Sequence, residues 1–248
     1  MQLQDFFNKN PRVAVAYSGG VDSSYLLYAA KTAGCDVRAY FVKSQFQPTF
    51  ELDDAKRLAE SVGIVLTVGT LDILCSDCVA LNPPDRCYHC KTAMLIKLWE
   101  MVRADGISVL CDGSNADDAE FDRPGMRALR EQGVLSPLRD CGLSKADIRR
   151  LSEQAGLLTH DKPSYACLAT RIPTGMAITD DTLRKVERAE DALFGMGFTD
   201  FRVRLTSQGE AKVQLPDAQI GIAVERRTEI LVVLGRDFDS VMLDLRSR

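Results

Sequence analysis

A short segment rich in glycine and serine constrains the fold of this chain more than any other feature. An apolar run at residues 12–17 ends at Ser18-Gly19-Gly20, and apolar residues recur at helical spacing from Val21 onward. This order predicts a buried parallel strand, a tight turn and a helix. Such a turn brings backbone N–H groups and the positive end of a helix together, so it predicts a site for an anion such as phosphate.

The same alternation of strands and helices continues beyond this unit. Further strands are predicted at residues 37–42, 64–68 and 107–111, and helices at about 51–61, 91–103 and 145–154. Right-handed connections between such elements predict a Rossmann-like parallel sheet with helices on both faces. Ligands of such a sheet gather at the carboxyl ends of the strands.

A different pattern follows in the last third of the chain. It predicts a helix at 180–194, hairpin-like strands at 201–205 and 211–215, a helix at about 219–233 and a short strand at 241–245. We therefore predict an α/β fold in two parts. Residues 1–168 form the first domain, which contains the glycine turn, and residues 169–248 form a smaller α+β domain.

Composition and charge narrow the classes of partner. The 31 Lys and Arg residues against 35 Asp and Glu residues give a net charge of −4, which disfavours a polyanion such as nucleic acid. The longest apolar runs are shorter than the roughly 18 residues that a membrane span needs, and residues 1–10 lack the features of a signal peptide. We therefore expect a cytoplasmic protein with a small-molecule substrate and no membrane partner.

Side chains within the turn sharpen the prediction. The hydroxyl groups of Ser18, Ser23 and Ser24 add hydrogen-bond donors for phosphate. The carboxylate of Asp22 would repel a phosphate unless a cation lies between them, so Asp22 is a candidate Mg²⁺ ligand. Ser44 follows the second strand, where sheet geometry favours contact with adenosine. The alternative is a glycine turn that is merely capped by Ser or Asp.

The string S-G-G-V-D-S resembles the PP-loop of the N-type ATP pyrophosphatases. The resemblance implies that residues 18–24 hold the β and γ phosphates of ATP. It also implies the reaction: a substrate oxygen attacks the α phosphate, pyrophosphate leaves, and a nitrogen or sulfur nucleophile then displaces the adenylated group.

Six further motifs narrow the resemblance. They are NPPDRCYHCK (82–91), DGSNADD (112–118), RPG (123–125), SPL (136–138), KPSYACLATRIP (162–173) and RVR (202–204). From about Arg12 to Leu245 the chain resembles the LarE family, the ATP-dependent sulfur transferases of nickel-pincer nucleotide biosynthesis. The resemblance implies that a carboxylate of pyridinium-3,5-dicarboxylate mononucleotide is adenylated and that a protein-borne sulfur displaces AMP, which leaves a thiocarboxylate. It also implies a homo-oligomer, such as a hexamer.

Cysteines provide the candidate sulfur chemistry, because eight of them in a reducing compartment are not expected to form a disulfide framework. Cys167 corresponds to the family's sulfur-donating cysteine, which in one branch gives up its own sulfur. In another branch three cysteines, here Cys87, Cys90 and Cys167, hold a [4Fe-4S] cluster. The spacing of Cys75, Cys78, Cys87 and Cys90 leaves a zinc site open as an alternative.

Charged residues of the last third are candidates for the substrate pocket. Arg202 and Arg204 alternate along a predicted strand, so both guanidinium groups could meet one phosphate. The family resemblance adds Glu190 to this pocket. Arg171 lies four residues after Cys167 and could favour its thiolate, or it could be a surface salt-bridge partner.

Two other functions stay open at this point. The first is a PP-loop enzyme of tRNA thiolation, and the second is a regulatory protein that binds a nucleotide without cleaving it. Asp117 and Asp118 follow a predicted strand end, so they either contact Mg²⁺ and the nucleotide or cap a turn.

Overall fold

A computed structural model describes residues 2–118 and 124–247 of the chain. Arg123, which opens one of the family motifs, lies outside the described residues. The chain forms two compact units, and each is described by itself. The first unit comprises Met1–Asp72 and Asp85–Ser164, and the second comprises Ile73–Pro84 and Tyr165–Arg248.

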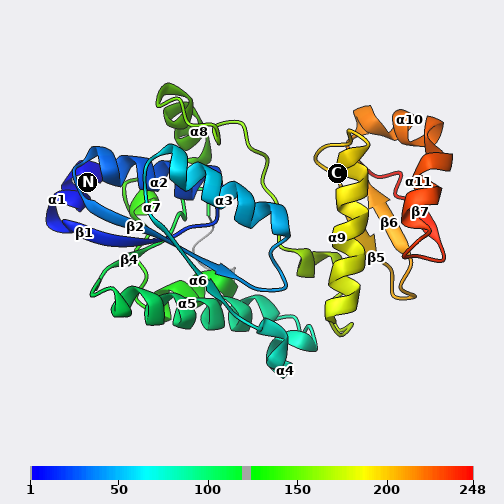
Figure 1. Cartoon of the computed structure of the whole chain (residues 1–248), viewed down its shortest axis with the longest axis horizontal. Coiled ribbons are helices and arrows are strands. Elements are labelled where there is room, and N and C mark those ends of the chain that lie inside the picture. Colours follow the sequence, from blue (N-terminus) through cyan, green and yellow to red (C-terminus); the bar gives the residue numbers. More distant parts are fainter. Residues whose placement is uncertain (1, 119–123, 248) are drawn as a thin grey trace. The chain divides into compact units, whose positions relative to one another are not determined.

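A parallel sheet forms the centre of the first unit (Figure 1). Its strands are β1 (Arg12–Ala16), β2 (Asp36–Lys43), β3 (Leu66–Thr70) and β4 (Leu110–Cys111). They lie in the order β3-β2-β1-β4, and each neighbouring pair is parallel. The predicted α/β class is therefore confirmed.

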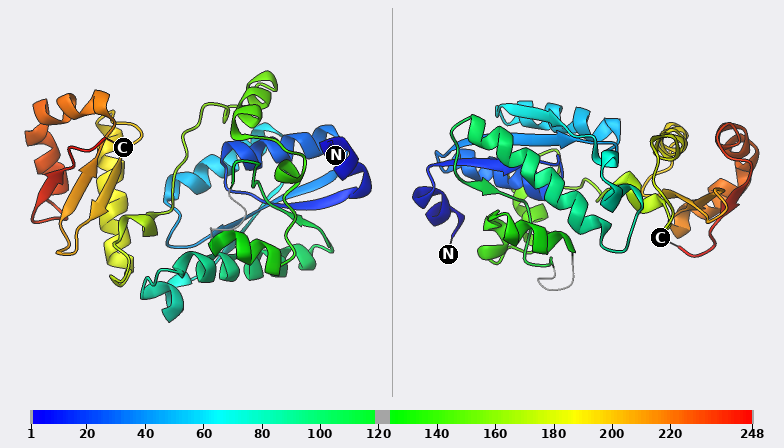
Figure 2. Two further views of the ribbon diagram at one scale, coloured as in Figure 1. Left: turned by 180° about the vertical axis from the view of Figure 1, so that it is seen from behind. Right: turned by 90° about the horizontal axis from the view of Figure 1, so that it is seen from below.

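Helices cover both faces of this sheet because alternate residues of each strand point to opposite sides. Val13 and Val15 of β1 belong to one apolar cluster, whereas Ala14 belongs to another. The first cluster includes residues of α1 (Leu3–Lys9), α2 (Val21–Thr32), α3 (Thr49–Ser61), α7 (Pro137–Asp140) and α8 (Lys145–Gln154). The second includes residues of α5 (Arg86–Ala104) and α6 (Pro124–Glu131). Figure 2 shows these two layers from two further directions.

Several predicted boundaries move for identifiable reasons. Strand β3 begins at Leu66 because the N–H of Ile64 still closes the end of α3, donating to the carbonyl of Ala59 at 3.0 Å. Helix α5 begins at Arg86, before its predicted start near residue 91. The two cysteines of the C-x-x-C motif at 87–90 therefore lie on a helix.

The second unit contains a small mixed sheet. Its strands are β5 (Arg202–Leu205), β6 (Ala211–Gln214) and β7 (Val241–Leu243), and its helices are η1 (Ile73–Cys75), α4 (Asp77–Ala80), η2 (Leu168–Arg171), α9 (Asp180–Gly195), α10 (Asp217–Glu225) and α11 (Arg227–Leu234). The predicted hairpin is confirmed, since β5 and β6 pair antiparallel. The single helix predicted at 219–233 is wrong. Arg226 leaves the helical conformation (ψ 16°) and its guanidinium donates to the carbonyl of Met196 at 2.6 Å, which divides the segment in two.

Residues 73–84 join the second unit although the first unit surrounds them in sequence. The side chain of Asn82 donates to the carbonyl of Pro173 at 2.8 Å, and its own carbonyl accepts from Gly175 at 2.8 Å. The N–H of Ile178 donates to the carbonyl of Ala80 at 2.7 Å. Among the residues described, no helix combines the length and apolar character that crossing a bilayer requires.

Candidate functional site

The glycine turn between β1 and α2 has the conformation that its sequence predicts. Gly19 has φ +69°, and a Cβ atom at this position would lie 3.2 Å from Cα of Ala55 on α3. Glycine therefore permits both the left-handed backbone and the close approach of a helix. Gly20 directly precedes α2, so the free N–H groups of the first helical turn lie beside it.

The serine hydroxyls of the turn divide into two groups. Oγ of Ser18 and Oγ of Ser23 lie 3.2 Å apart, and Ser23 donates to the carbonyl of Gly20 at 3.3 Å. Ser24 is buried and pairs with the hydroxyl of Tyr17 at 3.2 Å. Burial raises the pKa of Tyr17 to about 12, so this hydroxyl stays protonated. Ser18 is the exposed member of the group.

Asp22 lies in the first turn of α2 and has two polar neighbours. Nζ of Lys145 is 2.5 Å from its Oδ2, and the amide of Asn115 donates to its Oδ1 at 3.5 Å. Lys145 is the first residue of α8, and its backbone N–H donates to a carboxylate oxygen of Asp117 at 2.7 Å. The candidate magnesium ligand is thus half-buried and paired with an ammonium group.

A second lysine reaches the same turn. Nζ of Lys162 donates to the carbonyl of Gly19 at 3.1 Å and to Oδ2 of Asp54 at 2.8 Å. Lys162 and Lys145 therefore bring two positive charges to the turn. The sequence analysis named neither residue as part of this site. For Lys162 the available signal was its place in the motif at 162–173.

The end of β4 also approaches α2 closely. A Cβ atom on Gly113 would lie 2.9 Å from the backbone N of Ser23, so only glycine fits there without displacement. The preceding carboxylate, Asp112, accepts from Ser114 at 2.5 Å and from Ser136 at 2.7 Å. These bonds tie the segment after β4 to Ser136, which directly precedes α7.

The other polar candidates at the strand ends make turn contacts. Asp118 accepts from the N–H of Asn115 at 3.0 Å, and the N–H of Asp117 donates to the side chain of Asn115 at 2.9 Å. These contacts correspond to the alternative in which Asp117 and Asp118 cap a turn. Ser44 is buried at the end of β2, where its hydroxyl donates to the side chain of Gln47 at 2.8 Å.

The candidate sulfur residues belong to different units. Cys87 and Cys90 lie three residues apart at the start of α5 in the first unit, so their side chains share one side of the helix. Cys75, Cys78 and Cys167 belong to the second unit. All five side chains are at least partly exposed. Within the described parts of the chain, no three or more His, Cys, Asp or Glu side chains form a group that could hold a metal.

A buried carboxylate organises the charged candidates of the second unit. Glu190 on α9 accepts from Arg171 at 2.8 and 3.0 Å, from the N–H of Val203 at 2.8 Å and from the hydroxyl of Tyr165. Burial opposes the charge of Arg171, but the hydrogen bonds and charge of Glu190 outweigh it and raise the pKa of Arg171. Arg171 is 1% exposed. Its interpretation as a surface salt-bridge partner is therefore wrong.

Arg202 and Arg204 lie on β5 near this carboxylate. Arg202 is buried, and its guanidinium lies 5.1 Å from the ring centre of Tyr165. Burial, and then the charge of Arg171, lower the pKa of Arg202. Arg204 donates to the carbonyl of Thr170 at 2.7 Å. The second unit thus brings the guanidinium groups of Arg171 and Arg202 near one carboxylate, and that of Arg204 to the carbonyl of Thr170.

Known proteins are similar to this chain over most of its length. An uncharacterized protein, slr1717 of Synechocystis, is 36% identical over 219 residues, which cover 88% of this chain and 81% of that protein. The pyridinium-3,5-bisthiocarboxylic acid mononucleotide synthase of Lactiplantibacillus plantarum is 34% identical over 239 residues, covering 94% of this chain and 86% of that protein. The chain belongs to the LarE family.

Two further matches agree with a PP-loop in this LarE protein. The family model described as the tRNA methyl transferase HUP domain matches residues 11–72, which contain the glycine turn. A tRNA-specific 2-thiouridylase of Fusobacterium nucleatum is 29% identical over 182 residues, covering 64% of this chain and 49% of that protein. This LarE protein is accordingly an ATP-utilising sulfurtransferase.

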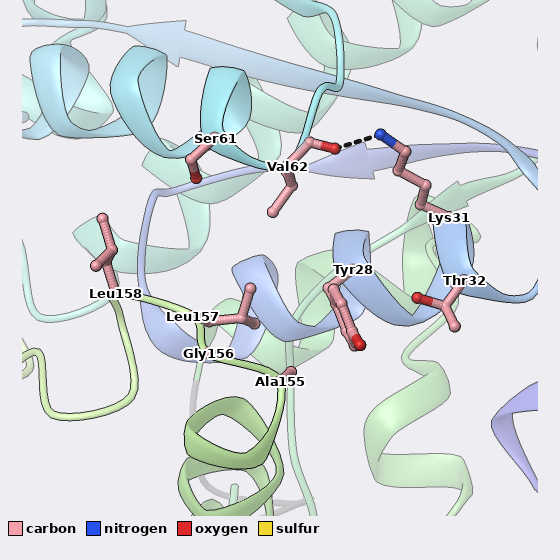
Figure 3. Close-up of a pocket in the computed structure, with 9 residues that line it drawn as sticks. All are labelled: Tyr28, Lys31, Thr32, Ser61, Val62, Ala155, Gly156, Leu157 and Leu158. Carbon is pink, nitrogen blue, oxygen red and sulfur yellow. Dashed lines mark hydrogen bonds between the residues drawn. The ribbon is translucent and has the colours of Figure 1, made fainter.

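A cavity of about 470 Å³ lies elsewhere in the first unit of the LarE protein (Figure 3). Its walls come from the later turns of α2 and the ends of α3 and α8, and Lys31 donates across it to the carbonyl of Val62 at 2.5 Å. Tyr28, which lines it, is seven residues beyond Val21, or about 10 Å along the helix. The cavity is thus separate from the glycine turn.

Proposed function

We propose that this LarE protein uses ATP to adenylate a carboxylate of pyridinium-3,5-dicarboxylate mononucleotide and then converts it to a thiocarboxylate. The observation that carries the proposal is the convergence of Asp22, Lys145 and Lys162 on the glycine turn. A relative of 34% identity, named for the bisthiocarboxylic acid mononucleotide, supports the choice of substrate.

The turn supplies groups suited to a triphosphate. Backbone N–H groups at the start of α2 bind anionic oxygens, with Ser18 and Ser23 as further donors, and Lys145 and Lys162 offset the phosphate charge. The half-buried carboxylate of Asp22 is a hard oxygen ligand that suits Mg²⁺, which usually binds through one or two carboxylates and substrate phosphates. Bound Mg²⁺ would supply charge neutralisation at the phosphates.

The proposed reaction has two stages, adenylation and sulfur transfer. A carboxylate oxygen of the substrate forms a bond to the α phosphorus, the bond from that phosphorus to the bridging oxygen breaks, and pyrophosphate leaves. A sulfur nucleophile then attacks the acyl carbon, and AMP leaves with the electron pair. The protein contributes chiefly by orienting the reactants and stabilising charge.

Cys167 is the proposed source or holder of the sulfur. In one form of the proposal the thiolate of Cys167 attacks the acyl carbon and forms a thioester as AMP leaves. Loss of the Cα proton of Cys167 and cleavage of its Cβ–Sγ bond then release the thiocarboxylate, and the residue ends as dehydroalanine. In the other, Cys87, Cys90 and Cys167 hold a [4Fe-4S] cluster, which would supply an extra sulfide. The adjacent thiols of Cys87 and Cys90 on one helical turn suit one edge of such a cluster.

The charges of the second unit support its role in binding the substrate. Arg202 is a buried cation whose charge is opposed by burial and by Arg171, so an anion beside it would be stabilised. We assign Arg171, Glu190, Arg202 and Arg204 to the pocket for the mononucleotide. The predicted division at residue 168 and the homo-oligomer stay part of the proposal.

One experiment separates this function from the alternatives. The full chain, purified without oxygen and analysed for iron, sulfide and zinc, is incubated with Mg²⁺, ATP and the pyridinium mononucleotide. We expect pyrophosphate and a thiocarboxylate detected by mass spectrometry. Release of no pyrophosphate would favour a regulatory nucleotide-binding protein. Pyrophosphate release only with tRNA, and tRNA binding that survives about 0.2 M salt, would favour tRNA thiolation.

A further inference from the structure

Tyr165, in the second unit, contacts two guanidinium groups and one carboxylate. Its ring centre lies 4.7 Å from Cζ of Arg171 and 5.1 Å from Cζ of Arg202, and its hydroxyl donates to Oε2 of Glu190. The phenol is therefore a hydrogen-bond donor to the carboxylate.

The same carboxylate leads to the segment that carries Cys167. Glu190 holds the guanidinium of Arg171 through two hydrogen bonds. Nη1 of Arg171 then donates to the carbonyl of Ala166 at 2.8 Å and to the carbonyl of Cys167 at 3.4 Å. The backbone on both sides of the Ala166–Cys167 peptide is thus fixed by contacts that begin at the phenol of Tyr165.

We propose that Tyr165 is a positioning residue that links the guanidinium of Arg202 to the segment carrying Cys167. The inference rests on the proposed function, in which an anionic group of the substrate meets Arg202 and Cys167 provides or holds the sulfur. The new element is the physical connection between these two sites within one compact unit.

Burial and charge explain why binding of an anion at Arg202 would affect the segment that carries Cys167. The side chains of Arg171, Glu190 and Arg202 are each at least 94% buried, and a close-packed interior has little room to absorb a shift. Arg171 and Arg202 both lie close to the ring of Tyr165, and their charges repel each other. An anion at Arg202 offsets this repulsion, so it holds the guanidinium groups, the ring and the carboxylate together and orders the Cys167 segment.

Hydrogen exchange of backbone amides in the full-length protein tests the connection. The reporter is the peptide at 166–172, in which the N–H of Thr170 donates to the carbonyl of Cys167 at 3.0 Å. The reference is the β5–β6 turn in the same unit, where the N–H of Gly209 donates to the carbonyl of Thr206 at 3.0 Å. We expect inorganic phosphate, compared with chloride at equal ionic strength, to slow exchange about tenfold at 166–172 and to leave the turn unchanged.

Two variants complete the test. Tyr165→Phe keeps the ring but loses the hydroxyl, so we expect exchange at 166–172 to rise about tenfold and no longer to respond to phosphate. Tenfold corresponds to about 1.4 kcal/mol, close to what a hydrogen bond to a charged group contributes. Tyr28→Phe removes a phenol from the first unit and should match the wild type.

Catalysis gives a separate readout. Tyr165→Phe should lower kcat for thiocarboxylate formation about tenfold while the KM for ATP stays unchanged, because the glycine turn belongs to the first unit. Two results would overturn the proposed connection. One is that amide exchange at 166–172 in Tyr165→Phe equals that of the wild type, and the other is that phosphate does not change exchange at 166–172 in the wild type. Failure of the proposed function differs from this, since it would appear as a wild-type protein that makes no thiocarboxylate.

Discussion

At the scale of single residues, Asp22 carries the largest expected effect on the first chemical step. Asp22→Ala removes the carboxylate from the glycine turn, and we expect pyrophosphate release to fall at least about 100-fold, as for loss of one preorganised electrostatic group. Its partly exposed pair with Lys145 contributes little to stability, so the unfolding midpoint should change little. Asp53→Ala removes an exposed carboxylate of α3 and serves as the control. Full activity of Asp22→Ala would exclude it from metal positioning.

Cys167 belongs to the second chemical step at the same scale. Cys167→Ala should still release pyrophosphate but form no thiocarboxylate, because the adenylate is made without the thiol. Mass spectrometry of substrate and protein distinguishes the two products. Burial raises the pKa of Cys141, which makes its thiol a poor nucleophile, so Cys141→Ala should keep both steps. Thiocarboxylate made by Cys167→Ala would mean that another group donates the sulfur.

At the scale of the elements, the approach of α3 to the glycine turn depends on Gly19. Gly19→Ala places a methyl group 3.2 Å from Cα of Ala55 at φ +69°, so we expect a loss of about 1–2 kcal/mol in the free energy of unfolding and a raised KM for ATP. Gly221→Ala is the matched control on α10. A Cβ atom there meets nothing within 4 Å, so alanine should stabilise that helix by about 0.5–1 kcal/mol. Equal effects of both changes would contradict the argument.

The pairing of β6 with the chain after β7 gives a prediction about pH. The side chain of Gln214 donates to Asp244 at 3.0 Å, and this bond, followed by the N–H of Arg246, holds the pKa of Asp244 well below its usual range. A carboxyl group whose pKa is lowered by folding stabilises the folded state at pH values above its unfolded-state pKa, which is near 4. This contribution is lost as the pH falls through the pKa of the folded state. Asp244→Asn should therefore lower the urea midpoint at pH 7, and lower it by a smaller amount near pH 2. An equal deficit at both values would point to lost packing instead.

The sequence predicted local elements better than contacts between distant ones. The strand, turn and helix at 12–32 follow from neighbouring residues, and so does the β5–β6 hairpin. Lys145 and Lys162 reach the turn from positions 123 and 143 residues away from their partners, and no periodic pattern reports such a contact. The start of α5 at Arg86 was missed because the cysteine motif, rather than helical spacing, dominates that stretch.

At the scale of the whole molecule, residues 73–84 belong to the second unit although the residues before and after them belong to the first. This is the largest difference from the predicted division of the chain. Composition gives no sign of it, because the segment is short and several of its ties are backbone and amide hydrogen bonds. The chain therefore passes between the units after Asp72, after Pro84 and after Ser164. Cys75, Cys87 and Cys167 each follow one of these passages by three residues.

This arrangement also delays the folding of residues 73–84 during synthesis of the chain. The amide of Asn82 bonds to a carbonyl 91 residues later in the chain. A ribosome that adds about 5–20 residues per second needs roughly 5–20 s to supply that partner. During this interval the segment from Ile73 to Pro84, which carries two thiols, lacks its hydrogen-bond partners in the second unit. The newborn chain is therefore most vulnerable to proteases and oxidants there, before its last third has been translated.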